Sequence, residues 1–503
     1  MKKETEQQKI GLFIKELRER RGMTQEAFAK ALETSQSSIP RMEKGEQNFT
    51  TELLLKISNV LDHKIVSVNS SIDFEVKGGK KLSGTIKTNF SKNGSVGLLC
   101  ASLLNKGTTT LHGIARIEEV NRVIEILESI GVSVKWIDKN SVQIIPPQKL
   151  ALDKINIESA IKTRSVIMLI GPLIHLLPKF SIPHVSGCKL GKRTISAHTY
   201  ALSDFGVKIK TTNNEYIIET PNLKRADIVM YEAGDTACEN ILIAASKING
   251  ITTIKFASAN YMVQEICFFL EKLGVKIEGI GTSTLTIHGL KDLNQNIEYY
   301  NSEDPIESMM FISAAITTDS ELTITRSPID FLSLELEKLK RMGLKYKILR
   351  KYKSYNERTN LVDIKIFPSK LKALEDKIHA NPYPGINMDN LPFFVPIAIK
   401  AKGQTMIHDW VYENRAIYFT ELNRLGASIT LADPHRVYIQ GGTPLKPAQV
   451  VCPPALRPAM IILIGMLGAP GTSILRNVYM INRGYEEIAE RLNSIGADIK
   501  ILK

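Results

Sequence analysis

The chain has 503 residues, of which 43% are hydrophobic, and it carries a formal net charge of +13 with a sequence pI near 9.2. One hydrophobic core cannot serve a chain of this length, so we expect several domains of about 100–200 residues each. The positive charge favours anionic partners such as phosphates or nucleic acid, although solubility alone could explain it.

The cysteines and the apolar stretches exclude three further classes of protein. Five cysteines are scattered without C-x-x-C spacing, which indicates neither a disulfide framework nor a zinc site. The N-terminus lacks an apolar signal-peptide core, and the longest apolar stretch, residues 165–178, is shorter than the roughly 20 residues of a membrane helix. We therefore expect a protein of the reducing cytoplasm, without membrane insertion, metal or cofactor. The cysteines are Cys100, Cys188, Cys238, Cys267 and Cys452.

Residues 8–62 differ from everything that follows and predict a small all-α module of four helices. An apolar stripe that begins at Ile10 and stops at Arg21-Gly22 predicts the first helix. Capping residues and glycines set the other boundaries: Thr24 begins the second helix, Thr34 or Ser35 the third, which ends at Gly45, and Thr50 or Thr51 the fourth.

The string at residues 23–32, followed by 35–39 and 41–45, resembles the Cro/repressor-type helix-turn-helix family. The resemblance implies a DNA-binding domain over residues 1–63, with Gln36, Ser37 and Arg41 at base edges in the major groove and Gln25 at a phosphate. Pro40 departs from the commonest pattern and puts the register of base reading in question. The alternative is a helical module that binds a protein or packs on the neighbouring domain. Residues 64–72 are expected to form a linker.

The rest of the chain contains one sequence motif six times: an apolar helical stretch, an apolar residue, a glycine and a strand in which apolar and polar residues alternate. The glycines fall roughly 70 to 80 residues apart, which marks an internal repeat. A turn followed by a Thr- or Ser-bearing strand precedes each copy, so the pattern predicts six βαβ-type units. The six glycines are Gly131, Gly206, Gly274, Gly343, Gly426 and Gly496.

Polar clusters interrupt these units at helix starts. Lys92 and Asn93 precede an apolar helix, where a cation and an amide can hold an anion beside unpaired helix amides, and Arg164 opens another helix. The run from His184 to His198 combines two glycines with several cations, which is typical of a mobile loop around an anion. A lone cysteine is usually an inert buried residue, but the cations beside Cys188 would lower its pKa.

From about residue 72 to the C-terminus the sequence resembles the UDP-N-acetylglucosamine 1-carboxyvinyltransferase family of enolpyruvyl transferases and, more distantly, the shikimate-pathway enolpyruvyl transferases. The resemblance implies two inside-out α/β domains of three βαβαββ units each, which agrees with the six repeats. It implies one lobe from residues 73–91 and 300–503 and a second lobe from residues 92–299. It also implies transfer of the enolpyruvyl group of phosphoenolpyruvate to UDP-N-acetylglucosamine with release of phosphate, the opening step of peptidoglycan precursor synthesis.

The same resemblance assigns the site. Phosphoenolpyruvate is doubly anionic, so fixed cations must hold it, and addition of a hydroxyl to its C2 needs a base for that hydroxyl and an acid for C3. We expect Asp304 as the base and Cys188 as the C3 acid, with Asp389 assisting the C3 proton. The phosphoenolpyruvate-binding cations are Lys92, Arg164, Arg193 and Arg457, and the UDP-sugar-binding residues are Asn93, Arg164, Asp304, His198 and Glu413. Singly, such carboxylates are ordinary loop or cap residues.

The departures from the family fall mainly on the nucleotide side. Residues 232–236, with Glu232 and Asp235, replace a Lys and a Ser-Val-Gly run that grip the diphosphate, and two acids there would repel it. Another acceptor is therefore an alternative, as is a regulator whose transferase-like body only senses a ligand. The basic stretch from Lys338 to Lys353 has no clear counterpart, and we interpret it as a solvated surface.

Overall fold

The computed structural model describes residues 5–61, 72–184 and 194–502. The chain divides into two compact units, one within residues 1–71 and one spanning residues 72–502. Each has its own hydrophobic core. Apart from Ile72, the linker expected at 64–72 lies outside the described residues. Within the described residues, no helix combines the length and the apolar character needed to cross a membrane.

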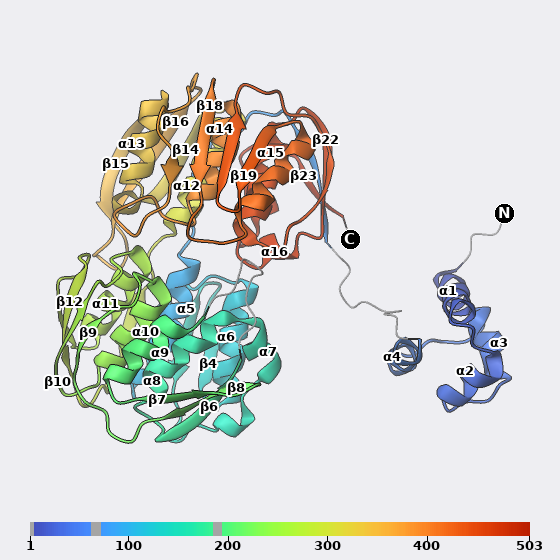
Figure 1. Ribbon diagram of the computed structural model, residues 1–503, viewed down its shortest axis with the longest axis horizontal. Helices are drawn as coiled ribbons and strands as arrows, with labels where there is room; N and C mark the ends of the chain where they lie inside the picture. Colours follow the sequence, from blue (N-terminus) through green and yellow to red (C-terminus); the bar gives the residue numbers. More distant parts are fainter. Residues whose placement is uncertain (1–4, 62–71, 185–193, 503) are drawn as a thin grey trace. The chain divides into compact units, whose positions relative to one another are not determined.

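The N-terminal unit is a four-helix module, as the capping pattern predicts (Figure 1). Thr24 and Thr50 each cap a helix, because their hydroxyls accept the backbone N–H of Ala27 and Leu53 at 3.1 Å and 3.2 Å. Phe28 and Ile39 are fully buried in its core. The helices are α1 (Glu6–Arg20), α2 (Gln25–Ala31), α3 (Ser38–Glu43) and α4 (Thr51–Val60).

The third helix begins later than the sequence indicates, which corrects the expected cap at Thr34 or Ser35. Helix α3 starts at Ser38, and Ser37 at its N-cap makes no side-chain capping bond. The turn before it is closed instead by Ser38, whose backbone N–H donates to the Ser35 carbonyl at 3.0 Å. Pro40 consequently falls in the first turn, where its missing N–H has no intrahelical partner to lose.

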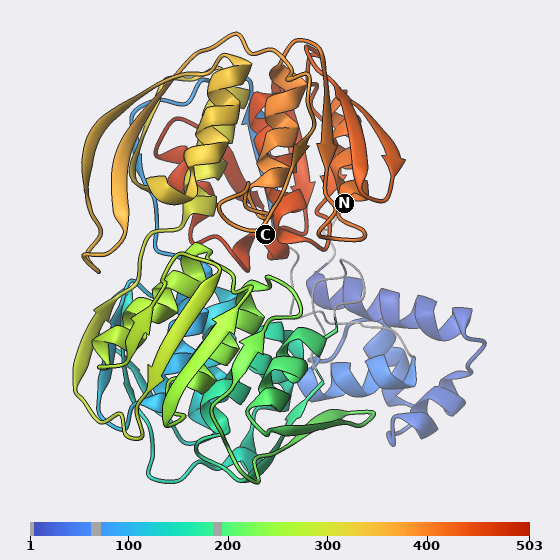
Figure 2. The ribbon, with the colours of Figure 1, turned by 60° about the vertical axis from the view of Figure 1, so that its left-hand side comes forward.

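The C-terminal unit contains six sheets in two lobes of three, which confirms the predicted inside-out α/β fold (Figures 1 and 2). Lobe 1 has the sheet β21 (Gln449–Val451), β22 (Gly471–Arg476), β1 (Asp73–Gly78), β23 (Ile499–Leu502), the sheet β15 (Lys345–Lys353), β16 (Asn360–Phe367), β14 (Leu322–Pro328), β2 (Thr85–Lys87), and the sheet β17 (Ile378–His379), β18 (Gln404–His408), β20 (Arg436–Gln440), β19 (Ser428–Asp433). Lobe 2 has the sheet β11 (Lys276–Glu278), β12 (Thr284–Gly289), β10 (Gly250–Lys255), β9 (Asp227–Val229), the sheet β13 (Ile297–Tyr300), β3 (Thr109–His112), β5 (Ser141–Ile145), β4 (Ser133–Trp136), and the sheet β6 (Lys179–Pro183), β8 (Glu215–Glu219), β7 (Lys208–Thr211).

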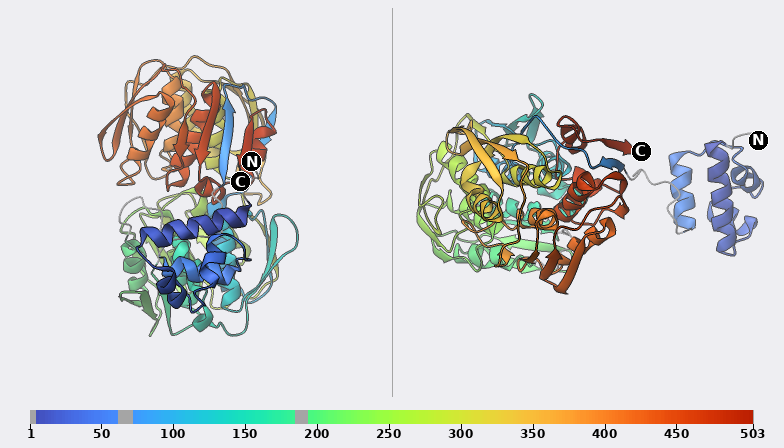
Figure 3. Two further views of the ribbon diagram at one scale, coloured as in Figure 1. Left: turned by 90° about the vertical axis from the view of Figure 1, so that its right-hand side faces the viewer. Right: turned by 90° about the horizontal axis from the view of Figure 1, so that it is seen from above.

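The helices lie inside and the sheets outside in each lobe, as Figure 3 also shows. All 13 residues of α12 are buried, so this helix is covered on every side. It packs against α14 and α15 in lobe 1, while α10 packs against α5, α8 and α11 in lobe 2. The lobe 1 helices are α12 (Pro305–Thr317), α13 (Ser333–Met342), α14 (Phe394–Lys400), α15 (Leu456–Gly468), α16 (Tyr479–Asn482) and α17 (Ile488–Asn493). The lobe 2 helices are α5 (Lys92–Ala101), α6 (Glu118–Ser129), α7 (Ile157–Lys162), α8 (Ile170–Leu173), α9 (Ser196–Asp204), α10 (Asp235–Ala245) and α11 (Tyr261–Lys272).

The six repeat glycines all follow a helix and all have positive φ, between +83° and +104°. At Gly343 and Gly426 this left-handed residue is itself the helix C-cap. A side chain would be strained there, so glycine is the residue that ends each helix and turns the chain into the next strand. Each glycine of the sequence repeat therefore marks the point at which a helix ends.

The chain crosses between the lobes at two segments that run side by side. Phe90, before α5, forms an antiparallel bridge with Glu303, before α12. The backbone N–H of Ser91 donates to the Ser302 carbonyl at 2.7 Å, and that of Asp304 donates to the Asn89 carbonyl at 2.8 Å. The first strand of lobe 1 pairs with the last one, Asp73 opposite Leu502, so the two ends of this unit close one sheet.

Candidate active site

Positive charge from both lobes meets at the carboxylate of Glu119. The Nζ of Lys92, at the start of α5, lies 3.1 Å from Glu119 Oε2, and Nη2 of Arg483 lies 3.6 Å from the same oxygen. Lys92 and Glu119 belong to lobe 2, whereas Arg483 follows α16 in lobe 1. Burial would raise the pKa of Glu119, but the charges of Lys92 and Arg483 outweigh it and hold the pKa below its ordinary value. Two cations against one ionised acid leave this point net positive.

A third cation, Arg457, lies in the first turn of α15 and is 5% exposed. Its Nη2 and Nε lie 3.0 Å and 3.3 Å from Asp389 Oδ2, and its Nη1 donates to the Tyr485 hydroxyl at 2.6 Å. Ala455 gives α15 no side-chain cap. The positive end of the helix dipole therefore adds to the charge of Arg457.

Asp389 is held ionised by two guanidinium groups. Burial acts to raise its pKa, yet the charges of Arg457 and Arg415 lower it below the ordinary value. Arg415 Nη1 lies 3.8 Å from Asp389 Oδ1, and its other nitrogens bind Asp409 and the Met388 carbonyl. Arg415 is 1% exposed, so it fixes the position of Asp389 from behind.

Asp304 is a second carboxylate within the electrostatic reach of Arg457. It caps α12, because its Oδ1 accepts the backbone N–H of Ile306 at 2.8 Å. Burial raises the pKa of Asp304, and the charge of Arg457 only partly offsets this effect. Two carboxylates near one guanidinium thus have pKa values displaced in opposite directions, an arrangement that suits separate proton-transfer roles.

Asn93 and His198 extend this region within lobe 2. The Asn93 amide donates to the hydroxyl of buried Tyr261 at 2.9 Å. The Nδ1 of His198 lies 3.1 Å from the amide nitrogen of Asn240, so the ring is neutral with its proton on Nε2. Burial and the charge of Arg164 lower the pKa of His198 to about 4. The Arg164 guanidinium donates to the Thr194 carbonyl at 2.9 Å and so contacts the end of the loop that precedes α9.

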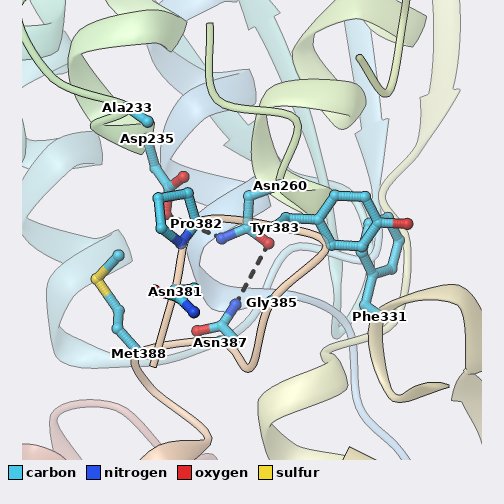
Figure 4. Close-up of a pocket in the computed structure, with 10 residues that line it drawn as sticks. All are labelled: Ala233, Asp235, Asn260, Phe331, Asn381, Pro382, Tyr383, Gly385, Asn387 and Met388. Atoms are coloured by element: carbon cyan, nitrogen blue, oxygen red, sulfur yellow. Dashed lines mark hydrogen bonds between the residues drawn. The ribbon is translucent and has the colours of Figure 1, made fainter. Parts of the chain in front are cut away.

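A small pocket spans the two lobes beside Ala233 and Asp235, within the stretch at 232–236 (Figure 4). The Asn387 amide of lobe 1 donates to Asn260 Oδ1 of lobe 2 at 3.3 Å. Asp235 accepts from Ser258 and Asn260 at 2.5 Å and 2.9 Å, and burial raises its pKa. Among the described residues, the lining consists of amides, apolar groups, one phenol and one carboxylate, without a cation: Ala233, Asp235, Asn260, Phe331, Asn381, Pro382, Tyr383, Gly385, Asn387 and Met388.

The structure brings some predicted residues together and leaves others apart. Lys92, Asp389, Arg457 and Asp304 form one electrostatic group, because the charge of Arg457 acts on both aspartates and that of Lys92 does so as well. Glu413 is exposed on the segment before η6 (Ala416–Leu425). Cys188 and Arg193 lie outside the described residues, so their roles stay predictions.

Sequence reasoning did not assign roles to four residues that this geometry singles out. Glu119 and Arg483 join Lys92, Tyr485 binds Arg457, and Asn240 fixes the tautomer of His198. Arg483 and Tyr485 are two positions apart in the sequence, and this charge next to an aromatic residue was a usable signal. Glu119 had none, because an acid at a helix start is ordinary.

The N-terminal unit exposes three of its four predicted DNA-contacting residues. Gln36, Ser37 and Arg41 are exposed on the turn before α3 and on α3 itself. The fourth, Gln25, uses its amide N–H within the unit, donating to Glu43 Oε2 at 2.9 Å. Glu43 also pairs with buried Arg18 at 2.5 Å, so these three residues hold α1, α2 and α3 together.

Comparisons with known proteins agree with both units. Residues 76–492 match the family model EPSP synthase (3-phosphoshikimate 1-carboxyvinyltransferase), and residues 14–64 match the helix-turn-helix family. The chain is 32% identical over 437 residues to a UDP-N-acetylglucosamine 1-carboxyvinyltransferase of Bradyrhizobium diazoefficiens, covering 85% of this chain and 98% of the relative. It is 34% identical over 438 residues to the enzyme of that name from Treponema denticola, covering 85% and 99%.

Solved structures share the fold of the C-terminal unit at lower sequence identity. The enolpyruvyl transferase NikO from Streptomyces tendae superposes with a TM-score of 0.73 at 22% identity, covering 86% of this chain and 99% of that one. An EPSP synthase from Acinetobacter baumannii gives a TM-score of 0.67 at 19% identity, covering 86% and 100%.

Proposed function

Because this chain belongs to the enolpyruvyl transferase family that includes the EPSP synthases and the UDP-N-acetylglucosamine 1-carboxyvinyltransferases, we propose that it transfers the enolpyruvyl group of phosphoenolpyruvate to the 3'-hydroxyl of UDP-N-acetylglucosamine. The reaction releases phosphate and would take place in the cytoplasm, as the opening step of peptidoglycan precursor synthesis. The N-terminal helix-turn-helix unit adds a DNA-binding module to this transferase.

One observation carries the proposal: fixed cations and two carboxylates of opposite pKa displacement lie where the lobes meet. Phosphoenolpyruvate brings a carboxylate and a phosphate, which Lys92, Arg457 and Arg483 can neutralise. Negative charge grows on the departing phosphate, so preplaced cations lower the barrier without reorganising. Arg164, which contacts the Thr194 carbonyl, would add to this set, and so would Arg193, as the family resemblance implies.

The carboxylates divide the proton traffic of an addition followed by an elimination. In the addition, Asp304 takes the proton of the acceptor hydroxyl as its oxygen bonds to C2, and C3 receives a proton from Cys188. The raised pKa of Asp304 makes it a stronger base than an ordinary aspartate. In the elimination, C3 loses a proton towards ionised Asp389, the double bond re-forms, and the bond from C2 to the phosphate oxygen breaks.

The structure supports binding of phosphoenolpyruvate more strongly than it supports UDP-N-acetylglucosamine as the acceptor. Asn93, His198, Arg164, Asp304 and Glu413 are the proposed contacts to the UDP-sugar. In the part of the chain that the structure describes, the lining of the pocket in Figure 4 contains Asp235 and no cation, a poor match for a diphosphate. A different acceptor, or a body that senses a ligand without turnover, is the second candidate that this observation supports.

Phosphate release tests the proposal directly. The protein should release phosphate from phosphoenolpyruvate only when UDP-N-acetylglucosamine is also present, and Lys92→Ala should lower kcat/KM by roughly 10²–10³. Lys106→Ala, an exposed residue paired with Asp292, serves as the matched control. Binding of both ligands without phosphate release would show that the protein senses these ligands without catalysing the transfer. If phosphate were released only with a different hydroxyl compound, that compound class would be the acceptor in place of UDP-N-acetylglucosamine.

A further inference from the structure

The residues of the proposed site come from both lobes and from the segments that join them. Lys92 and Asp304 lie at the two crossing segments, whereas Arg457 and Asp389 belong to lobe 1 and Asn93 to lobe 2. A ligand bound between such groups enters when the lobes move apart and is enclosed when they approach, which is hinge motion about the crossing segments. The contacts made by those segments therefore set how easily the site opens.

The tip of the β15–β16 hairpin, residues 354–359, reaches from lobe 1 to lobe 2. Nη1 of Arg358 lies 2.8 Å from Glu271 Oε2 on α11, and its guanidinium stands 4.5 Å from the centre of the Phe268 ring on the same helix. Figures 1 and 2 show this hairpin descending along one side of lobe 1 towards the other lobe. The basic strand β15 exposes its lysines, as the sequence indicates, but the tip beyond it is a contact surface.

The same tip contacts the crossing segment before α12. The Ser354 hydroxyl donates to Glu303 Oε2 at 2.7 Å, and the Tyr355 ring lies 5.8 Å from the Tyr300 ring. Tyr300 in turn stacks on His112 of β3, with 4.3 Å between ring centres. The hairpin thus contacts the hinge and also the lobe beyond it.

A β-bulge on β14 supports the tip from within lobe 1. The register of β14 against β16 shifts between Ile324 and Ser327, and Arg326 adopts φ +60°. A non-glycine residue rarely holds this conformation unless its surroundings fix it. Arg326 Nε donates to Glu303 Oε1 at 2.7 Å, and its guanidinium lies 4.2 Å from the Tyr355 ring centre. Glu303 is therefore bound by the bulge on one oxygen and by the tip on the other.

Glu265 on α11 completes the arrangement from lobe 2. Its carboxylate accepts from the Ser302 backbone N–H at 3.2 Å, the Ser302 hydroxyl at 2.5 Å and the Tyr299 hydroxyl at 2.8 Å. The side chain of Asn356 in the hairpin tip is near enough to this carboxylate to lower its pKa. Two neighbouring residues of the crossing segment are thus fixed from opposite lobes: Ser302 by Glu265 of lobe 2, and Glu303 by Arg326 and Ser354 of lobe 1.

We propose that residues 354–359 act as a brace across the hinge, holding the two lobes at a set angle and thereby controlling how readily the site opens. Arg358 is 47% exposed on its side chain and Glu271 is 27% exposed. Contacts this exposed are individually weak, so the brace biases the opening equilibrium without locking it. The proposal concerns the hinge and holds for any acceptor.

Amide hydrogen exchange on the full-length protein tests the brace without reference to turnover. In the double variant Asn356→Ala with Arg358→Ala, the amides of residues 299–303 and of α11 should exchange about tenfold faster than in the wild type. The sheet of β18 and β20 should keep its protection. Lys351→Ala, exposed on β15 of the same hairpin, is the matched control and should change nothing. Unchanged exchange in residues 299–303 would overturn the proposal.

A charge exchange covers the case in which the double variant loses protection everywhere. Arg358→Glu alone should speed exchange in residues 299–303 and α11, and adding Glu271→Arg should restore most of the protection. Failure of the second substitution to restore it would show that the Arg358–Glu271 contact does not act on the hinge, and would also overturn the brace.

Discussion

Arg457 and Asp389 form an ion pair of 3.0 Å in which the arginine is buried and the carboxylate side chain is 25% exposed. The acidic side of the pair is therefore partly open to solvent. A bound anion would compete with Asp389 for the same guanidinium. The pair is consequently a point at which phosphoenolpyruvate binding and the charge of a proposed proton carrier are coupled.

Replacement of Arg457 should damage both binding and chemistry. Arg457→Ala is expected to lower kcat/KM by about 10²–10³, because it removes a cation from the phosphate and leaves Asp389 with a higher pKa. Arg457→Lys should lose less, since it keeps the charge but not the two-atom contact. Steady-state kinetics at varied phosphoenolpyruvate measures this, with Arg476→Ala on β22 as the control. If Arg457→Ala had wild-type kinetics, Arg457 would take no part in binding phosphoenolpyruvate or in the reaction.

The acid side of the pH–rate profile should report Asp304. Its pKa is raised by burial, so protonation stops it from acting as a base at a higher pH than for an ordinary aspartate near 3.9. The rate should fall as pH decreases through this range, and Asp304→Asn should lose about 10²–10⁴ in kcat. An acid limb that survives in the residual activity of Asp304→Asn, and disappears in Asp389→Asn, would make Asp389 the base.

One thiol of the five should react with electrophiles. Cys100, Cys238, Cys267 and Cys452 are buried, and burial raises the pKa of each, to about 12 for Cys238 and Cys452. Such thiols carry almost no thiolate at neutral pH. We expect the epoxide fosfomycin to add once, at Cys188, and phosphoenolpyruvate to slow it. Peptide mass spectrometry locates the adduct, and labelling that persists in Cys188→Ser would disprove this expectation.

The hinge carboxylate Glu265 should make stability fall as pH rises. Burial raises its pKa from 4.5 to about 7, partly offset by hydrogen bonds from Ser302 and Tyr299. The folded protein then binds more protons than the unfolded chain between these values, so stability is fully present below pH 4.5 and lost as pH rises through 7. The loss is of the order of 3 kcal/mol.

The measurement compares Glu265→Gln with the wild type. The Tm of the wild type minus that of the variant should decrease between pH 5 and pH 8.5, because only the wild type must expel a proton. A difference that is constant with pH would show that Glu265 is ionised throughout.

DNA binding should depend on the exposed residues around α3. The double variant Gln36→Ala with Arg41→Ala should weaken binding by about 1–3 kcal/mol for each base-reading side chain removed, without loss of stability, because both side chains are exposed. Lys30→Ala, exposed in the last turn of α2, is the control. A genome-wide footprint supplies the site, and fluorescence anisotropy on that site measures affinity. Equal affinity in the double variant would favour a protein-binding module.

The fold was predictable where the signal is local. Gly131 and its five equivalents follow helices in a left-handed conformation that favours glycine. Thr24 and Thr50 each accept a hydrogen bond from a backbone N–H in the first turn of the helix that they cap. The third cap was wrong because Ser35, Ser37 and Ser38 are chemically equivalent candidates, and only the turn geometry selects among them. The limits of the lobes stay a prediction.

The site was predictable only in part, because its contacts join distant segments. Resemblance supplied Lys92, Asp304, Asp389 and Arg457, but no local pattern connects Glu119 with Arg483 across 364 positions. The basic stretch from Lys338 to Lys353 was interpreted as solvated, and its lysines on β15 are exposed. The partner of Arg358 lies on another lobe, so the hairpin tip carried no sequence signal of contact.

The pairing of Asp73 with Leu502 has a consequence for synthesis on the ribosome. The first strand of lobe 1 lacks its neighbours β22 and β23 until residues 471–476 and 499–502 have been made. Lobe 2, which is continuous between the crossing segments, can complete itself while lobe 1 waits. A nascent chain that has not reached residue 471 would thus present a finished N-terminal unit, a finished lobe 2 and an open sheet edge, and would gain the proposed chemistry only after β22 and β23 have paired with β1.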